Sequence, residues 1–276
     1  MATMAVMADT PTRTDPAFYV RTGESTYDST VFTRGPWDAR SQHAGPPAAL
    51  LGYAIEHRSD ARPEMRVARI AYDITRPVQI DTLTVTTKVE RSGRRTEYVN
   101  AELSTYDGVV AMTARALLIR SDAGASPEVF AGSVQAPPDA LADETAAFPF
   151  DEGYHTAINN RYASGSFAEP GPATVWFRMK YPLILGEPID PLSRVLVAAD
   201  SGNGVSQVLS PHEYVFVNPE LTVHLHRYPV GEWVCLDAAS TITGDGIGLA
   251  DTALFDATGQ IGRGTQSLYV AKRSEH

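Results

Sequence analysis

Cysteine and long apolar runs are almost absent from this sequence. The single cysteine, Cys235, lies in the strand-like run "EWVCLDAAS", so a disulfide framework and a cysteine-based metal site are excluded. No apolar run approaches the roughly 18 residues that a membrane span requires. Residues 1–15 have neither a basic start nor a long apolar core, which indicates a disordered tail and not a signal peptide. We therefore expect a reducing, cytoplasmic setting and no membrane span.

Basic residues and common hydrolase motifs are also scarce. Lys and Arg number 23 against 33 Asp and Glu, a formal net charge of −10, which argues against nucleic acid or an anionic membrane as the main partner. The sequence has no G-x-S-x-G elbow, no P-loop and no Cys/His pair in a suitable context. The glycines of "GDGIG", residues 244–248, indicate a hairpin turn. These absences favour a mechanism without a covalent nucleophile.

An internal repeat is the most informative feature that is present. Residues 43–120 and 190–272 read alike, and each opens with a small-residue apolar helix that has Pro near its start: "GPPAALLGYAIEHR" and "DPLSRVLVAAD". Arg76 and Arg227 are separated by the same number of residues as the turn glycines Gly108 and Gly259. One spacing serves both pairs, so a duplicated unit is predicted.

Four strand-like runs rich in Val, Thr, Leu and Tyr follow each predicted helix. We predict that each unit is a helix followed by an antiparallel meander of about four strands, with further strand-like runs before each helix completing the sheet. The fold class is thus α+β, with two units joined edge to edge. The predicted division is a tail at 1–15, a first unit at 16–121, a linker at 122–152 and a second unit at 153–276.

Asp200 ends the second helix in "VLVAADSGNGVSQV". The glycines and Asn203 after it predict a helix stop in the left-handed conformation. A carboxylate at a helix C-terminus faces the negative end of the helix dipole, at a cost of about 0.3–1 kcal/mol, so another reason for Asp200 is expected. The helix end and apolar neighbours favour a raised pKa, suited to a general base. The alternative is an exposed turn aspartate.

Alternate residues of a strand point to the same face, so Gln266 shares a face with the apolar Leu268 and Val270. Such a glutamine must be hydrogen-bonded, either to the helix end or to a water beside Asp200. His224 and His226 share a strand face, but no third ligand has suitable spacing, so no metal site is predicted.

The stretches "QHAGPPAALL", "TRPVQIDTLTV", "DSGNG", "VNPELTVHLHR" and "GTQSLYV" resemble, in order and spacing, the acyl-CoA thioesterase II type, the TesB-like double-hotdog family. The resemblance implies two fused hotdog units and hydrolysis of acyl-CoA to free acid and CoA by a water. It implies that Asp200, Asn218 and Gln266 hold that water; the best-known members carry Thr in place of Asn218. It implies no cofactor, and a homo-oligomer, dimer or higher, is possible.

The start of the first helix is the expected oxyanion and substrate site. Backbone amides near Gly45 are candidate oxyanion donors, and His43 is a candidate substrate contact. In hotdog enzymes the site lies between two units, so helix residues of one unit can serve an acid of the other.

Two alternatives to the thioesterase remain open at this point. Asn218 in place of Thr is compatible with a non-catalytic acyl-CoA-binding or scaffold protein. A hotdog dehydratase would pair a His with a carboxylate on the central helix, but the first helix offers only Glu56 and His57 at its far end. The repeat spacing places Ala49, Val67 and Arg115 opposite Asp200, Asn218 and Gln266, so the polar group is predicted in the second unit only.

Overall fold

The computed structural model describes residues 15–129, 135–144 and 148–273, so most of the predicted tail at 1–15 lies outside the described residues. The first part of the chain forms β1 (Tyr19–Arg21), β2 (Thr26–Ser29), η1 (Val31–Thr33), α1 (Gly45–Glu56), β3 (Met65–Ile74), β4 (Thr82–Ser92), β5 (Thr96–Ser104) and β6 (Val110–Arg120). The helix and the four strands after it agree with the predicted first unit.

The second part repeats this order with additions. Its elements are η2 (Pro138–Ala140), α2 (Tyr154–Ala157), β7 (Ile158–Ser164), β8 (Ala173–Met179), α3 (Pro191–Ala199), α4 (Gly202–Val205), β9 (Tyr214–Val217), β10 (Glu220–Leu225), β11 (Val234–Ile242), β12 (Ile247–Asp256) and β13 (Gly259–Lys272). Strand β7 and the short helix α2 were not expected from the sequence.

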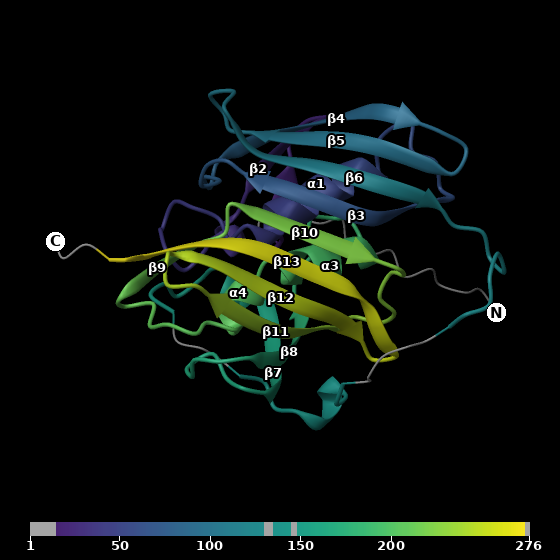
Figure 1. The fold of residues 1–276 in the computed structure, drawn as a ribbon. Coiled ribbons are helices and arrows are strands. Elements are labelled where there is room, and N and C mark those ends of the chain that lie inside the picture. Colours follow the sequence, from purple (N-terminus) through teal and green to yellow (C-terminus); the bar gives the residue numbers. More distant parts are fainter. Residues whose placement is uncertain (1–14, 130–134, 145–147, 274–276) are drawn as a thin grey trace, which may run out of the picture.

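All strands belong to one antiparallel sheet, with the order β1-β2-β4-β5-β6-β3-β10-β13-β12-β11-β8-β7, and β9 pairs with β13. The edge-to-edge joint of the two units is the β3–β10 pair, and Figure 1 shows the sheet running without a break from β4 at the top to β7 at the bottom. Because the sheet is continuous, the division into two units remains a prediction.

The predicted four-strand meander is only partly right. In each half the last three strands form a meander, whereas β3 pairs with β6 and β10 pairs with β13. The connections from β3 to β4 and from β10 to β11 are too long for a tight hairpin, and each contains a proline. As a result β3 and β10 are free to pair with each other.

Helices α1 and α3 pack against each other on one side of the sheet (Figure 1). Prolines at the first positions start both helices, and the Asp190 side chain accepts a bond from the Ser193 N–H at the start of α3. The helices run antiparallel, since a Cβ at Gly45, at the start of α1, would clash with the Val197 carbonyl oxygen near the end of α3. Gly52, further along α1, faces Leu196 and Leu192, nearer the start of α3. The start of α1 therefore lies beside the end of α3.

The end of α3 differs from the prediction in its conformation. The helix stops at Ala199 as expected, but the glycines after it are not left-handed, because Gly202–Val205 form α4 without positive φ. Gly202 is needed for space instead: a Cβ there would press on the side chains of Thr252 and Gln266. The run "YVFVNPELTVHLHRYP" also divides into two strands, and Asn218 lies in the break.

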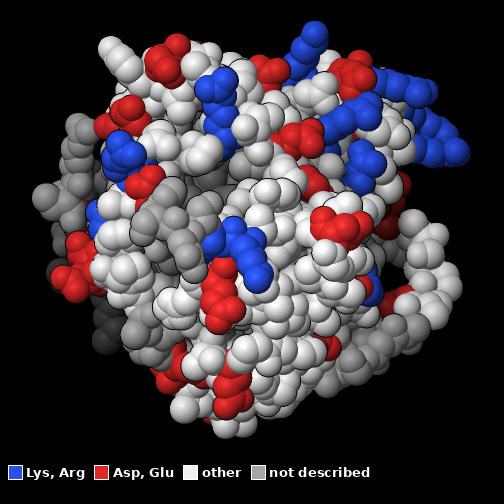
Figure 2. All heavy atoms as spheres, turned by 60° about the vertical axis from the view of Figure 1, so that its left-hand side comes forward, with Lys and Arg blue, Asp and Glu red and all other residues white. Residues whose placement is uncertain are grey.

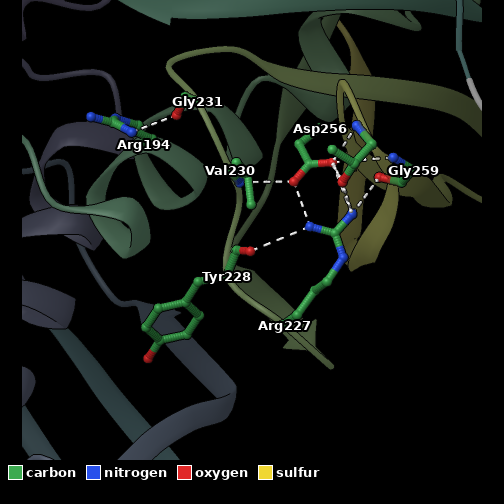
Figure 3. Close-up of polar contacts among 8 residues, drawn as sticks. Arg194, Arg227, Tyr228, Val230, Gly231, Asp256 and Gly259 are labelled. Atoms are coloured by element: carbon green, nitrogen blue, oxygen red, sulfur yellow. Dashed lines mark hydrogen bonds and ion pairs between the residues drawn. The ribbon is translucent and has the colours of Figure 1, made fainter. Parts of the chain in front are cut away.

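A buried ion pair fixes the chain after β10. Asp256, fully buried, accepts bonds from the Arg227 guanidinium (2.8 Å for one of them) and from the Val230 and Gly259 N–H groups (Figure 3). Burial alone would raise the pKa of Asp256, but these bonds hold the pKa well below its ordinary value. The carboxylate is thus ionised and joins the β10–β11 connection to the β12–β13 turn.

The surface mixes both signs of charge. Figure 2 shows acidic and basic side chains interspersed over one face, with Lys and Arg gathered mainly at its upper right. Within the described ranges, none of the helices combines the length and apolar character that crossing a membrane takes.

Candidate functional site

The three polar residues singled out in the sequence meet at the end of α3. Asp200 caps this helix, and its Oδ1 accepts a bond from Asn218 Nδ2 (2.8 Å) and one from Gln266 Nε2 (3.1 Å). Asn218 comes from the break between β9 and β10, and Gln266 comes from β13. Asp200 is 8% exposed, so the alternative of an exposed turn aspartate is wrong.

Gln266 has all its polar atoms engaged by the protein. Its Nε2 also donates to the Asp200 carbonyl oxygen (3.1 Å), and its Oε1 accepts from the Asn203 N–H (2.9 Å). At 2% exposure it lies on the buried strand face with Leu268 and Val270, as alternation predicts. Gln266 therefore holds the carboxylate and the helix end in place.

His43 reaches the same carboxylate from the other half of the chain. Its Nδ1 lies 3.2 Å from Asp200 Oδ2 and also 3.1 Å from the Gly45 nitrogen, whose N–H points at it. A ring nitrogen either carries a proton or offers a lone pair, so it serves one of these contacts at a time. With a proton on Nδ1, His43 donates to Asp200 and the Gly45 N–H is released.

The electrostatics favour a neutral His43. Burial lowers its pKa, and the nearby Asp200 carboxylate offsets only part of that effect. At neutral pH the ring then carries one proton, on either Nδ1 or Nε2. The site combines one acid and one neutral imidazole, with Asp200 Oδ2 as the oxygen that no amide holds.

Tyr154 is a site residue that the sequence did not reveal. Its ring stacks on His43 at 3.9 Å between centroids with an interplanar angle of 6°. Its hydroxyl donates to the Val197 carbonyl oxygen (2.8 Å) and lies 3.0 Å from Ser201 Oγ. Burial raises the pKa of Tyr154. Tyr154 comes from α2, which has no repeat counterpart, so no pattern could have pointed to it.

The start of α1 offers few free amides. Pro46 and Pro47 have no N–H, and the Ala48 N–H donates to the Ala44 carbonyl oxygen. The Gly45 N–H is thus the first-turn donor that can change partner. Its lack of a side chain lets it approach the end of α3 closely.

A cavity of about 520 Å³ opens beside this group. Asp200, Asn218, His43 and Tyr154 line it, whereas Gln266 does not. Much of the remaining wall is aromatic: Trp37, Phe148, Tyr162, Phe167, Phe177 and Phe216. Arg76 and Arg273, both exposed, also contribute. The cavity can therefore take a largely apolar ligand with an anionic part.

The groups considered for a dehydratase or a metal do not gather here among the described residues. Glu56 and His57 lie at the far end of α1, away from Asp200, so the residues of the dehydratase alternative are not in this site. Within the part of the chain that is described, no three His, Cys, Asp or Glu side chains are grouped so as to hold a metal ion.

Family models match most of the chain. The acyl-CoA thioesterase N-terminal domain matches residues 33–119, and the acyl-CoA thioesterase C-terminal domain matches residues 134–270. The two matches reproduce the order of the two halves of the sheet. Among curated protein sequences, none is similar enough to this chain to count as a match.

Several solved structures share the whole fold. One from Thermobifida fusca, assigned as a thioesterase II, has a TM-score of 0.72 at 20% identity and covers 96% of this chain and 99% of its own. A hot dog protein of unknown function from Alicyclobacillus acidocaldarius gives 0.69 at 15% identity, covering 94% and 96%. The acyl-CoA thioesterase II TesB2 of Mycobacterium marinum gives 0.65 at 15%, covering 94% and 97%. The architecture is thus the predicted α+β double hotdog.

Proposed function

Since this chain belongs to the acyl-CoA thioesterase family, we propose that it hydrolyses acyl-CoA thioesters to free acid and CoA in the cavity beside Asp200. The family match shows a thioesterase enzyme and speaks against the non-catalytic scaffold considered from the sequence. One observation carries the assignment of the site: a buried carboxylate, held on one oxygen by two amides and contacted on the other by His43, lines an aromatic cavity.

In this proposal Asp200 is the general base. It takes a proton from a water, whose oxygen attacks the thioester carbonyl carbon. Asn218 uses one amide hydrogen on Asp200 and lines the cavity, so its remaining polar atoms are available to orient the water. Gln266 acts through Asp200, since its own donors are used.

The oxyanion formed by the attack needs a donor, and the Gly45 N–H is the proposed one. It becomes available when His43 Nδ1 carries the proton and donates to Asp200. When the tetrahedral intermediate collapses, the C–S bond breaks and the CoA sulfur takes the proton from Asp200. The carboxylate is then regenerated and no covalent enzyme intermediate forms.

The cavity walls support an acyl-CoA as substrate. The aromatic side chains suit the acyl group, because they offer a large apolar surface. Arg76 and Arg273 have no carboxylate within ion-pair distance among the described residues, so they are available for the CoA phosphates.

Thiol release by an Asp200→Asn variant tests this proposal. We expect the release of CoA from acyl-CoA esters of graded chain length to fall by about 10²–10⁴-fold, as loss of a general base does, while the melting temperature changes little. Asp251→Asn, which changes a half-buried carboxylate outside the cavity that pairs with Arg263, is the matched control and should keep full activity. Equal turnover by the Asp200→Asn variant and the wild type would overturn the assignment.

A further inference from the structure

A second cavity, of about 960 Å³, lies at the opposite ends of the two central helices. It is bounded by the end of α1 at Glu56 and His57 and by the start of α3 at Asp190 and Pro191. The first cavity lies where α1 starts and α3 ends. Because the helices are antiparallel, each cavity lies between the start of one helix and the end of the other. The first cavity has the start of α1 and the end of α3, and the second has the end of α1 and the start of α3.

The residues that line the two cavities beside the helices are also related by the repeat spacing. Residues 75–77 line the first cavity, and residues 226–228, one repeat spacing later, line the second. Residues 215–218 line the first, and residues 65–68, which the same spacing relates to 216–219, line the second. The second cavity is therefore the internal counterpart of the first.

The hydrolytic group is missing from the second cavity. The acid at the end of α1 is Glu56. The repeat spacing placed Ala49 opposite Asp200, but α1, at 12 residues, is longer than α3, so this spacing does not relate the two helix ends. Glu56 accepts a bond from the Tyr228 hydroxyl (2.5 Å), and Val67 stands where Asn218 stands in the first cavity. No side-chain amide is there to hold a water beside the acid.

The second cavity has several arginine side chains in its wall. Arg66 is exposed, lies with its guanidinium 5.5 Å from the Tyr228 ring centre, and has no carboxylate within ion-pair distance among the described residues. Within the described ranges, the one ion pair of Arg120 is with the exposed Asp122 (3.0 Å), an interaction worth little in water. Arg62 also lines the wall, but its guanidinium lies 3.4 Å from the buried Glu97 carboxylate.

The acids in the wall and its two remaining arginines, Arg58 and Arg227, are already engaged. Arg58 forms ion pairs with the carboxylates of Glu97 and Asp60. Both oxygens of Asp190 accept bonds from Ser193 (2.7 and 2.6 Å), and Glu56 is bonded to Tyr228. Figure 3 shows the Arg227 guanidinium turned toward Asp256 while the Tyr228 ring points the other way. Arg66 and Arg120 are thus the cations that can meet a ligand.

We propose that the second cavity is a non-catalytic binding site for a phosphate-bearing ligand, with Arg66 and Arg120 as its anion contacts. A guanidinium without a carboxylate partner matches phosphate oxygens, and the volume admits a nucleotide. The choice of CoA as the ligand to test rests on the proposed function, since CoA is its product. The site itself follows from the internal repeat and the charges.

Calorimetric titration of the full-length protein with CoA tests the proposal. We expect two binding events per chain, one of them weakened about ten-fold or more by Arg66→Ala and by Arg120→Ala. Thiol release should be unchanged in both variants, because neither residue lies in the first cavity. Arg115→Ala, which removes an exposed arginine paired with Glu90 outside both cavities, is the matched control and should leave both events intact.

The remaining arms separate this proposal from the proposed function. Inorganic pyrophosphate that competes with CoA for the Arg66-dependent event supports a phosphate site that accepts CoA. An Arg66-dependent pyrophosphate event beside a single CoA event per chain assigns the site to a free phosphate ligand. Arg76→Ala should weaken the other event only. A single CoA per chain that is insensitive to Arg66→Ala, without a pyrophosphate event, would overturn the second site while leaving the hydrolytic site standing. Thiol release by Asp200→Asn equal to that of the wild type would overturn the hydrolytic site alone.

Discussion

His43 is the residue whose proton decides what its neighbours can do. Its Nδ1 contacts both Asp200 and the Gly45 amide, and its pKa is lowered because burial outweighs the nearby carboxylate. A protonated His43 would hold Asp200 in an ion pair and weaken it as a base. Catalysis in the proposed mechanism therefore needs the neutral ring.

The pH dependence of kcat/KM follows from this. Since the His43 pKa lies below its ordinary value of about 6.5, the ring stays neutral as pH falls through 6.5, and activity should be lost only at lower pH. His43→Gln removes this titrating group, so the acid limb of this variant should be displaced from that of the wild type. Profiles of the two proteins over pH 4–9 check this, and an identical acid limb in both would contradict it.

Tyr154 offers a second test at a single side chain. Tyr154→Phe keeps the stacking on His43 but removes the bonds to Val197 and Ser201, so it should lower the unfolding free energy by about 1–3 kcal/mol and kcat only modestly. Tyr154→Leu also removes the stacked ring and should lower kcat further with little change in KM. Denaturant unfolding and steady-state kinetics measure both. Equal kcat in the two variants would argue against a role in holding His43.

The sequence predicted only those site residues that the internal repeat or the family resemblance marks. Asp200, Asn218 and Gln266 were found because the repeat and the family resemblance mark their positions, and the structure brings all three together. The contact between His43 and Asp200 joins the two halves of the chain, and Tyr154 comes from an unpredicted helix. Neither follows from local periodicity, because tertiary packing alone creates both contacts.

At the scale of elements, the close approach of α1 and α3 sets the geometry of the site. Gly45 packs against the Val197 carbonyl oxygen, so Gly45→Ala must push the helices apart. We expect a loss of about 1–3 kcal/mol in unfolding free energy and a clear fall in kcat, because the proposed oxyanion amide moves with the helix.

Gly204→Ala is the matched control for this glycine. A Cβ at Gly204 meets nothing within 4 Å, and the residue lies in the short helix α4, so the substitution should be neutral or slightly stabilising. Thermal unfolding and thiol release of both variants decide the matter. Similar losses in the two would show that helix spacing is not what Gly45 provides.

The elements themselves were more predictable than their pairing. Proline starts, apolar periodicity and turn glycines located both helices and the long strands, since these signals are local. The pairing of β3 with β6 and with β10 depends on contacts between residues far apart in the sequence. The β3–β6 pair was not predicted, and the β3–β10 pair was predicted only as an edge-to-edge joint of two units. The break at Asn218 was also missed, although Pro219 follows it in the sequence.

For the molecule as a whole, the continuous sheet and shared core predict that the two halves unfold together. One cluster of buried side chains contains residues from both helices and from most strands. The site also draws His43 from one half and Asp200 from the other. A destabilising substitution in the core of the first half should therefore also lower the stability of the second half.

Leu83→Ala tests this cooperativity, because Leu83 is fully buried in β4 and its truncation should cost about 2–5 kcal/mol. Trp176 and Trp233 both lie in the second half, so tryptophan fluorescence reports mainly on that half, whereas far-UV circular dichroism reports on the whole sheet. We expect both signals to shift to the same lower denaturant midpoint in a single transition. Leu249→Ala, at a side chain that is 46% exposed, should leave the midpoint nearly unchanged. A fluorescence midpoint that stays at the wild-type value while the circular dichroism midpoint falls would mean that the two halves unfold independently.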